Sequence, residues 1–577
     1  MSSHEASSTA HGPPEPARWL TVFTIAVAVS LVCLLVGALF VKRHPTVGPD
    51  EFGFLLDGQR LINHFELPLA EGMRSFYMIG YGFITAAAAF IGRSMKAEFT
   101  IALAFNIVFV VLTGVVLHAF ARRRLGLSSG WSRAVAVAAC SMPTLAANAL
   151  FSWSESLARL CFTLLVFLVF EYAAKPGLRL GIPMAVLIAW MPVIHGRFTL
   201  LLPLVVLVLL LGGWTRDMHR RIAALVSTAT VVVTYLFMRS ANSWLRRELY
   251  PGAGGKEGRV VRKIFDPSNY RDMLRAIVSQ GWYVAGTTLG IAVLGVVVLV
   301  WMARDGARSR RIADVVGPVF ALAAAGTVVF TSSLQLLYIV RPDHLAYGRY
   351  PEVITPILLV AGFSFIIRRS GSSPRLWWAG IAGIVVLCLG LLVGSGGDNL
   401  RIRIARGEYF EFGNGIGLDV PKHLLAPMGY VSVTLLFVAI GMAVMLLSRW
   451  RREAGIALFT LVSLGCTAFT VTQSIVPRRD YANHLTLDDE IRRMTKDHGR
   501  ALIGFDARAY SVHPFFDFRF QLHPIQVRRT NIEIDLPQGM VCVIGVPDRP
   551  PQPDWRQAGS EERLGLVLWK QDGVDSC

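Results

Sequence analysis

Apolar runs about as long as the hydrocarbon core of a bilayer is thick recur along the first 476 residues of the chain. An α-helix needs roughly 20 apolar residues to cross such a core. The runs that meet or approach this length cover residues 19–41, 98–120, 131–149, 156–173, 181–194, 197–214, 222–238, 283–303, 312–340, 350–367, 376–394, 426–447 and 455–473. The pattern therefore predicts an all-α polytopic membrane protein with about thirteen transmembrane helices.

A further run, residues 77–91, is shorter and rich in Gly and Ala. We interpret it as a segment that lies in or dips into the membrane interface, because counting it as a span would break the alternation of the basic turns described below. Residues 42–97 then form one outer loop with juxtamembrane helices, and residues 239–282 form a second outer loop.

The chain changes character after the last apolar run. Residues 477–577 contain a helix-like stretch, LDDEIRRMTKDHG, followed by three strand-like stretches, ALIGFD, MVCVIGV and LGLVLWK. This order predicts a small α/β domain. Cys542 and Cys577 lie in it, and the sequence leaves open whether they pair.

Composition and charge agree with a membrane protein and predict its orientation. The chain is 53% hydrophobic and 17% charged, whereas soluble domains carry about a quarter charged residues. Positive charges in short loops mark the cytoplasmic side. They cluster here at residues 122–124, 216–221, 304–311, 368–375 and 449–452. We therefore expect a cell-membrane protein whose N-terminal tail, residues 1–18, is cytoplasmic, whose membrane domain covers residues 19–476, and whose C-terminal domain is extracytoplasmic.

Two acids at the first outer loop are the first candidates for chemistry. Asp50 and Glu51 follow Pro49, and Pro followed by acids is also an ordinary helix start, favoured by the fixed φ of proline and by the helix dipole. The segment that follows carries Phe52, Leu55, Leu56 and Ile62 at helical spacing, which predicts that it lies along the membrane surface. Such a helix would hold both acids at the bilayer edge.

Three further polar groups lie on the same side. Glu155, in FSWSESLARL, precedes an apolar run, although it also suits a helix start capped by Ser152 or Ser154. His195 and Arg197 separate two short apolar runs, where a charge is either functional or extended to the lipid head groups.

The third group lies at the outer end of a span, in RPDHLAYGRYPEV. It contains His344, Tyr347, Arg349 and Tyr350, and the guanidinium of Arg349 suits a phosphate. The alternative is a basic and aromatic belt that anchors a helix end. The sequence contains no P-loop and no HExxH-type pair, and nothing in it indicates a nucleic-acid partner.

In order and sidedness, these motifs resemble the GT-C superfamily of integral-membrane glycosyltransferases, in the branch of protein mannosyltransferases, aminoarabinose transferases and actinobacterial arabinosyltransferases. The residues that carry the resemblance are GPDEF in the first outer loop, the basic turn LHAFARRRLG, the later acid Glu155, the segment HGRFTLLLP and the helix start GRYPEVITP. One departure is that the first loop contains ELPLAEG and no clear PPL element.

The resemblance implies transfer of a sugar from a polyprenyl-phosphate donor to a glycan, lipid or protein acceptor outside the membrane, with inversion at the anomeric carbon. It implies Asp50 as the general base, with Glu51 orienting Asp50 or contacting the acceptor, and Glu155 positioning the sugar or a divalent metal. Members of the superfamily differ in their need for a metal, so that point stays open. The expected donor-phosphate-binding residues are His195, Arg197, His344, Tyr347, Arg349 and Tyr350.

Two other classes of protein stay open at this point. A lipid or glycan transporter would use the basic outer loop for docking, and it predicts polar residues along a path through the membrane, which the apolar runs show in small number. A non-enzymatic scaffold of the cell envelope would give the acids after the first helix no role.

Overall fold

The computed structural model describes residues 15–46, 48–62, 78–214, 217–249, 264–337, 347–368, 374–395, 415–425, 429–477, 485–495, 502–506, 508, 512–522, 525–531, 536–537 and 539–577. Most of the N-terminal tail and parts of the two expected outer loops lie outside these residues.

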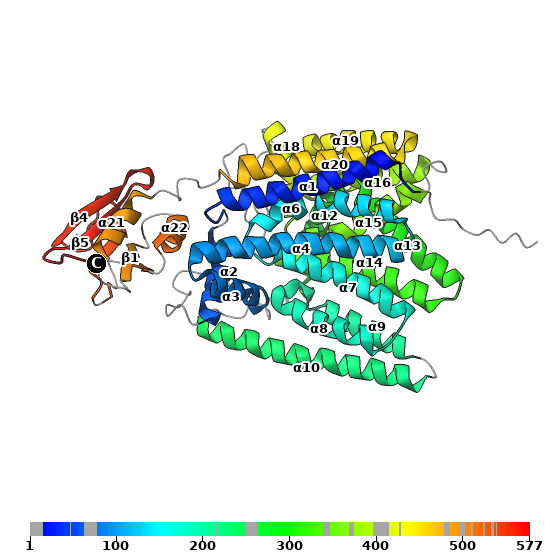
Figure 1. Cartoon of the computed structure of the whole chain (residues 1–577), viewed down its shortest axis with the longest axis horizontal. Coiled ribbons are helices and arrows are strands. Elements are labelled where there is room, and N and C mark those ends of the chain that lie inside the picture. The colour runs from blue at the N-terminus through cyan, green and yellow to red at the C-terminus, as the bar shows by residue number, and fades with distance from the viewer. Residues whose placement is uncertain are drawn as a thin grey trace, which may run out of the picture.

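The first part of the chain is a bundle of helices (Figure 1). Its helices are α1 (Arg18–Val41), α2 (Gly48–Leu61), α3 (Ile79–Gly92), α4 (Met95–Arg123), α5 (Ser129–Cys140), α6 (Pro143–Ala146), α7 (Glu155–Ala174), α8 (Leu178–Ile194), α9 (Leu201–Gly213), α10 (Met218–Leu249), α12 (Tyr270–Thr287), α13 (Ile291–Arg308), α14 (Ile312–Gln335), α15 (Thr355–Arg368), α16 (Pro374–Ser395), α18 (Asp419–Leu424), α19 (Tyr430–Trp450) and α20 (Arg452–Phe469). Short helical turns connect several of them: η1 (Ala147–Leu150), η2 (Gly196–Phe198), η3 (Pro267–Asn269), η5 (Pro351–Ile354), η7 (Ile416–Leu418) and the π-helical turn η8 (Thr470–Ile475).

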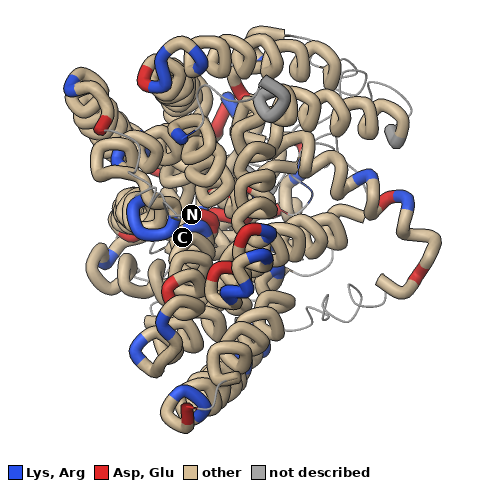
Figure 2. The backbone as a smooth tube through the Cα atoms, turned by 90° about the vertical axis from the view of Figure 1, so that its right-hand side faces the viewer, with Lys and Arg blue, Asp and Glu red and all other residues tan. Residues whose placement is uncertain are grey.

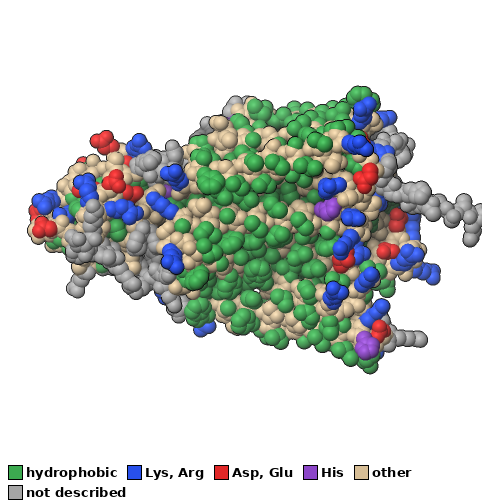
Figure 3. Space-filling view, viewed as in Figure 1, with side chains coloured by type: hydrophobic (Ala, Val, Ile, Leu, Met, Phe, Trp, Pro, Cys, Tyr) green, Lys and Arg blue, Asp and Glu red, His purple; other side chains and the backbone are tan. Residues whose placement is uncertain are grey.

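The outside of this bundle suits a lipid environment. Figure 3 shows a band of hydrophobic side chains around the middle of the helical part, with charged side chains gathered toward its two ends. Figure 2 views the bundle from the end away from the C-terminal domain and shows Lys and Arg at many of the helix ends on that side. The protein is therefore a multi-pass membrane protein; which side of the membrane each end faces stays a prediction.

The expected count of about thirteen spans is not confirmed. Among the described residues, nine helices are long and apolar enough to cross a membrane, or up to eleven if each of two bent pairs is one span. The run at 131–149 bends by 68° between α5 and α6, and the run at 283–303 falls across a bend of 105° between α12 and α13. At the second bend Gly290 has a φ of +81°, and a Cβ there would meet the backbone of Gly380. Hydropathy measures only how apolar a run is, so it does not detect such breaks.

The short run at 77–91 forms α3, which at 14 residues is shorter than a full span. It packs against α2 and α4 at the end of the bundle that faces the C-terminal domain (Figure 1). Gly58 of α2 allows this close approach, because an added Cβ would lie 2.5 Å from the backbone of Thr85 in α3. This arrangement agrees with a segment that does not cross the membrane.

That α2 lies along the membrane surface stays a prediction, but the structure shows that protein encloses this helix. Its apolar residues Phe52, Leu55 and Leu56 are buried, and so are the polar residues Glu51 and Asp57 on its other sides. Other parts of the protein enclose α2, whereas its sequence pattern indicated only that one face is apolar. The distinction matters because protein contacts hold a helix in one position more firmly than a fluid interface does.

The C-terminal domain is an α/β unit, as expected. Its five strands are β1 (Leu502–Asp506), β2 (Gln526–Thr530), β3 (Cys542–Gly545), β4 (Trp555–Glu561) and β5 (Leu566–Gln571), and its helices are α21 (Thr486–Met494) and α22 (Val512–Leu522). The sheet order is β2-β1-β3-β5-β4, with β1 parallel to β2 and β3, and β5 antiparallel to β3 and β4. The sequence pattern indicated α21, β1, β3 and β5; it did not indicate β2, β4 or α22.

Helix α22 docks the C-terminal domain onto α2. The ring of Phe516 stacks on Phe52 with 5.1 Å between centroids, and Phe520 lies edge-on to Phe52 at 5.6 Å and to Phe99 of α4 at 5.7 Å. His44 Nε2 lies 3.4 Å from Asp517 Oδ1 in the same contact. The domain therefore packs directly on the helix whose first turn carries Asp50 and Glu51.

A disulfide between Cys542 and Cys577 joins β3 to the C-terminal residue, which answers the question that the sequence left open. The other five cysteines are free thiols: Cys33, Cys140, Cys161, Cys388 and Cys466.

We predict that replacing both bonded cysteines, Cys542→Ser with Cys577→Ser, makes the C-terminal domain easier to unfold. The bond closes a loop with a sequence separation of 35, and a loop of that length is expected to contribute about 4 kcal/mol through the entropy of the unfolded chain. Limited proteolysis of the purified protein in detergent should cut the domain faster in the double variant. Cys33→Ser, which removes a free thiol, is the control; equal proteolysis rates for all three proteins would contradict the prediction.

Candidate active site

The site is built around Arg349, in the segment directly before η5. Its Nη1 donates to Asp50 Oδ2 and its Nε donates to Glu155 Oε1 at 2.5 Å. The guanidinium carbon lies 4.0 Å from the centroid of the Trp153 ring. A buried arginine needs opposite charge nearby, and here the charge comes from two acids about 200 and 300 positions earlier in the chain.

Asp50 and Glu51 both lie in the first turn of α2, so the helix-start reading of these acids is correct. Their environments differ. The Asp50 side chain is 33% exposed, whereas Glu51 is fully buried and accepts hydrogen bonds from the backbone N–H groups of Thr46 at 2.6 Å and Ser152 at 3.0 Å. Lys42 Nζ lies 3.9 Å from Glu51 as well. Glu51 thus connects the start of α2 to two neighbouring segments, and of the two acids Asp50 is the accessible one.

Glu155 opens α7 and is buried. The expected cap is not formed, because Ser154 occupies the N-cap position without a side-chain hydrogen bond to the helix. Glu155 Oε1 accepts from Arg349, while Glu155 Oε2 has no hydrogen-bond partner. One carboxylate oxygen of Glu155 therefore pairs with Arg349, and the other has no hydrogen-bond donor among the described residues.

His195 and Arg197 lie where the sequence placed a break, between α8 and α9. Arg197 does not extend to the lipid head groups: it is 1% exposed, and its Nε, Nη1 and Nη2 have no hydrogen-bond partner among the residues that the structure describes. Thr331 Oγ1 donates to the carbonyl of Arg197 at 3.1 Å and so holds its backbone. A buried arginine with unused guanidinium donors is rare in proteins, and it has the charge and the donors to bind an anion.

Tyr350 connects this arginine to the rest of the site. The Arg197 guanidinium carbon lies 5.1 Å from the Tyr350 ring centroid, the His195 ring packs edge-on against Tyr350 at 5.0 Å, and Tyr347 lies 4.6 Å from it. The structure thus brings together eight of the nine residues expected from the sequence, with Glu51 just behind Asp50. The ninth, His344, lies outside the described residues.

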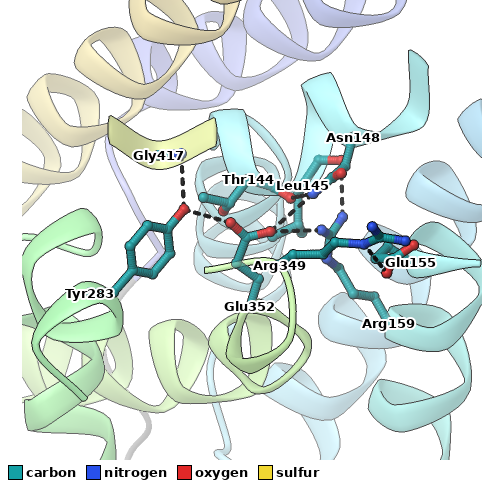
Figure 4. Close-up of polar contacts among 9 residues, drawn as sticks. All are labelled: Thr144, Leu145, Asn148, Glu155, Arg159, Tyr283, Arg349, Glu352 and Gly417. Atoms are coloured by element: carbon teal, nitrogen blue, oxygen red, sulfur yellow. Dashed lines mark hydrogen bonds and ion pairs between the residues drawn. The ribbon is translucent and has the colours of Figure 1, made fainter. Parts of the chain in front are cut away.

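A second layer of polar residues, absent from the sequence-based candidates, supports the site (Figure 4). Glu352 Oε2 accepts from Arg159 Nη2 at 3.0 Å and from Asn148 Nδ2 at 2.9 Å, and Glu352 Oε1 accepts from the hydroxyl of Tyr283 at 2.6 Å. The Tyr283 oxygen in turn accepts from the backbone N–H of Gly417 at 2.9 Å. Arg159 was the residue from which the sequence could have indicated this second layer. It lies four residues after Glu155 in an apolar run, and a charge at such a position requires a buried partner.

Several other buried polar atoms of this region have no hydrogen-bond partner. They are Trp153 Nε1, Ser154 Oγ, Asn148 Oδ1 and Thr144 Oγ1. Buried polar atoms are almost always paired, so these atoms, near Glu155 and Glu352 in the chain or in space, have donors and acceptors left for a polar ligand or water. In the part of the chain that the structure describes, no three His, Cys, Asp or Glu side chains are grouped as they would be to hold a metal ion.

The sequence matches no protein-family model and no curated protein. Its structure is similar to two crystal structures of ArnT from Cupriavidus metallidurans. One, bound to undecaprenyl phosphate, has a TM-score of 0.53 at 12% identity, and the alignment covers 97% of this chain and 99% of that one. The other, in the apo state, has a TM-score of 0.51 at 14% identity and covers 96% of this chain and 97% of that one. At these identities the likeness concerns the fold: the chain has the fold of ArnT, which is the GT-C fold expected from the resemblance of its sequence.

Proposed function

We propose that this protein is a membrane glycosyltransferase that moves a sugar from a polyprenyl-phosphate donor to an acceptor outside the membrane. The observation that carries the proposal is Arg197, a buried guanidinium with every donor unused, beside a cluster of two acids and an arginine. The crystallised ArnT bound to undecaprenyl phosphate supports the choice of lipid, because it has the same fold.

Arg197 is the proposed site of the donor phosphate. Arginine presents a planar fork of donors that matches phosphate oxygens. As the sugar leaves, negative charge grows on the phosphate, and a fixed cation that is already buried stabilises that charge without having to reorganise. Three aromatic side chains that carry polar atoms lie around this proposed phosphate position: His195, Tyr347 and Tyr350.

Asp50 is the proposed general base. Of Asp50, Glu51 and Glu155 it is the one whose side chain is partly exposed, so an acceptor hydroxyl can approach it. The acceptor oxygen forms a bond to the anomeric carbon while the bond from that carbon to the phosphate oxygen breaks. The hydroxyl proton goes to the Asp50 carboxylate, and the electron pair of the broken bond leaves with polyprenyl phosphate. Displacement from the face opposite the leaving group inverts the anomeric centre.

Arg349, Glu155 and Glu51 are proposed to hold this geometry. Two of the Arg349 nitrogens are engaged by Asp50 and Glu155, so we assign its first role to positioning these acids and only its remaining nitrogen to the phosphate. Glu155, with one free oxygen, is placed to bind a hydroxyl of the sugar or a divalent metal. Glu51 orients Asp50 by holding the first turn of α2 to its neighbours. The acceptor is a glycan, a lipid or a protein.

We predict that Asp50→Asn lowers the rate of sugar transfer by a factor on the order of 10² to 10⁴, the usual contribution of a general base. The measurement is the release of polyprenyl phosphate from a panel of polyprenyl-phosphate sugars in the presence of an acceptor mixture. Binding of the donor should change little, because an amide keeps the size of the side chain. Asp266→Asn, which alters an exposed acid of the second outer loop, is the control. Release at the wild-type rate by Asp50→Asn would remove Asp50 as the base.

We further predict that Arg197→Met weakens the binding of polyprenyl phosphate by roughly ten- to a hundredfold, the loss expected when charge-assisted hydrogen bonds to one group are removed. The dissociation constant of the bare lipid phosphate, measured with purified protein in detergent, tests this without turnover. Arg271→Met, which changes an exposed arginine of α12, should bind as the wild type does. Equal affinity of Arg197→Met and wild type would show that the phosphate binds elsewhere.

A further inference from the structure

Gln280, in α12, is a buried polar side chain whose hydrogen-bonding groups are unpaired among the described residues. It is 1% exposed, and within the described part of the chain neither its Nε2 nor its Oε1 has a hydrogen-bond partner. A buried polar group without a partner costs free energy of folding, roughly 1–3 kcal/mol. A polar amide at a position where an apolar residue would be more favourable for the fold therefore calls for a functional explanation.

The neighbours of Gln280 on α12 show which way this part of the helix faces. Ala276, one turn before, belongs to a buried apolar cluster with Tyr347 and Leu336, against which Tyr350 also packs. Tyr283, one turn after, donates to Glu352, and Gly348 packs so closely on the Tyr283 ring that an added Cβ would overlap it. At about 100° per residue, positions 276, 280 and 283 lie within roughly 60° of each other on the helix surface. Gln280 is therefore on the face of α12 that covers residues 347–352.

The other faces of α12 are used for packing. Trp282 Nε1 donates to Thr434 Oγ1 of α19 at 2.9 Å, and Gly281 faces Leu387 of α16. These contacts involve positions about 100° or more from Gln280 around the helix. Gln280 thus lies on a different side of α12 from the contacts of Trp282 and Gly281, on the side that packs against residues 347–352.

The chemistry of the amide limits what it binds. It offers two N–H donors and one carbonyl acceptor without charge. This set matches adjacent hydroxyl groups of a sugar, each of which both donates and accepts. It carries no charge to balance that of a phosphate, its acceptor oxygen finds no donor on a phosphate dianion, and it offers a polyprenyl chain no apolar surface.

We propose that Gln280 is a substrate-binding residue that hydrogen-bonds the hydroxyl groups of a sugar at the active site and thereby selects which sugar is accepted. The proposal rests on the proposed function for its setting. The sugar belongs either to the donor or to the acceptor, and these two sources share the same chemistry.

The test compares wild type with Gln280→Leu, which keeps the approximate size of the side chain and removes its polar atoms. Dissociation constants are measured for three probes: a panel of polyprenyl-phosphate sugars, bare polyprenyl phosphate, and free mono- and oligosaccharides. We expect Gln280→Leu to bind bare polyprenyl phosphate as tightly as wild type and to bind a sugar-bearing probe roughly ten- to a hundredfold more weakly, the loss of one or two hydrogen bonds. Loss confined to the lipid-linked sugars assigns Gln280 to the donor, and loss confined to the free saccharides assigns it to the acceptor.

Thermal unfolding without ligand separates a binding role from a structural one. Gln280→Leu should unfold at the same temperature as wild type or a higher one, because the atoms removed have no partners. Gln59→Leu is the matched control: Gln59 is a buried amide whose Nε2 donates to the buried Glu98, so its replacement should lower the unfolding temperature.

Three results would overturn the proposal: unchanged affinity for every probe, equal weakening for the bare and the sugar-bearing lipid, or a drop in unfolding temperature as large as that of Gln59→Leu. Turnover by wild type is measured separately. If wild type releases no polyprenyl phosphate from any donor, the proposed function fails. The dissociation constants of wild type and Gln280→Leu still show in that case whether Gln280 binds a sugar.

Discussion

The structure depends on one buried interaction, the guanidinium of Arg349 between the carboxylates of Asp50 and Glu155. Charges are costly inside a membrane protein unless they are paired, so this bridge holds together α2, α7 and the segment before η5. The Trp153 ring covers the guanidinium and keeps water from weakening the attraction. The elements that meet here come from three distant parts of the chain, and the bridge gives them one geometry.

Behind the bridge, the polar network around Glu352 also pairs buried charges with opposite charges. Arg159 pairs with Glu352 one helical turn below Glu155, so α7 contributes an acid to one charged group and a cation to the next. Tyr283 and Asn148 use the remaining hydrogen-bonding capacity of Glu352. Both oxygens of the Glu352 carboxylate are therefore engaged, whereas among the described residues the donors of Arg197, the Oε2 of Glu155 and the amide of Gln280 have no hydrogen-bond partner. We propose that the paired groups hold the fold and that the unpaired groups bind the substrate.

The C-terminal domain is connected to the same site through α2. The aromatic contacts of Phe516 and Phe520 with Phe52 lie two residues from Asp50 in the same helix. On its other side α2 is closed by α3, with Gly58 against Thr85. A helix enclosed in this way has little freedom to move along the membrane surface. The C-terminal domain thus takes part in holding the acid that we propose as the base.

The sequence alone was sufficient for the class of protein, because bilayer thickness imposes a length on apolar runs and a change of pattern marks the α/β domain. It was also sufficient for most of the candidate site, since a charge beside an apolar run is costly and stands out. It was insufficient for the bends in the runs at 131–149 and 283–303, because hydropathy does not depend on the direction of the backbone. It did not indicate α22 as a cover for α2, because an amphipathic helix has the same pattern whether lipid or protein covers it. Only the tertiary structure decided which charges meet, Arg349 with Asp50 and Glu155 and Arg159 with Glu352, and which buried polar side chains, Arg197 and Gln280, make no hydrogen bond among the described residues. The physical reason is that pairing depends on distances in space between residues up to 299 positions apart, and no local pattern records those distances.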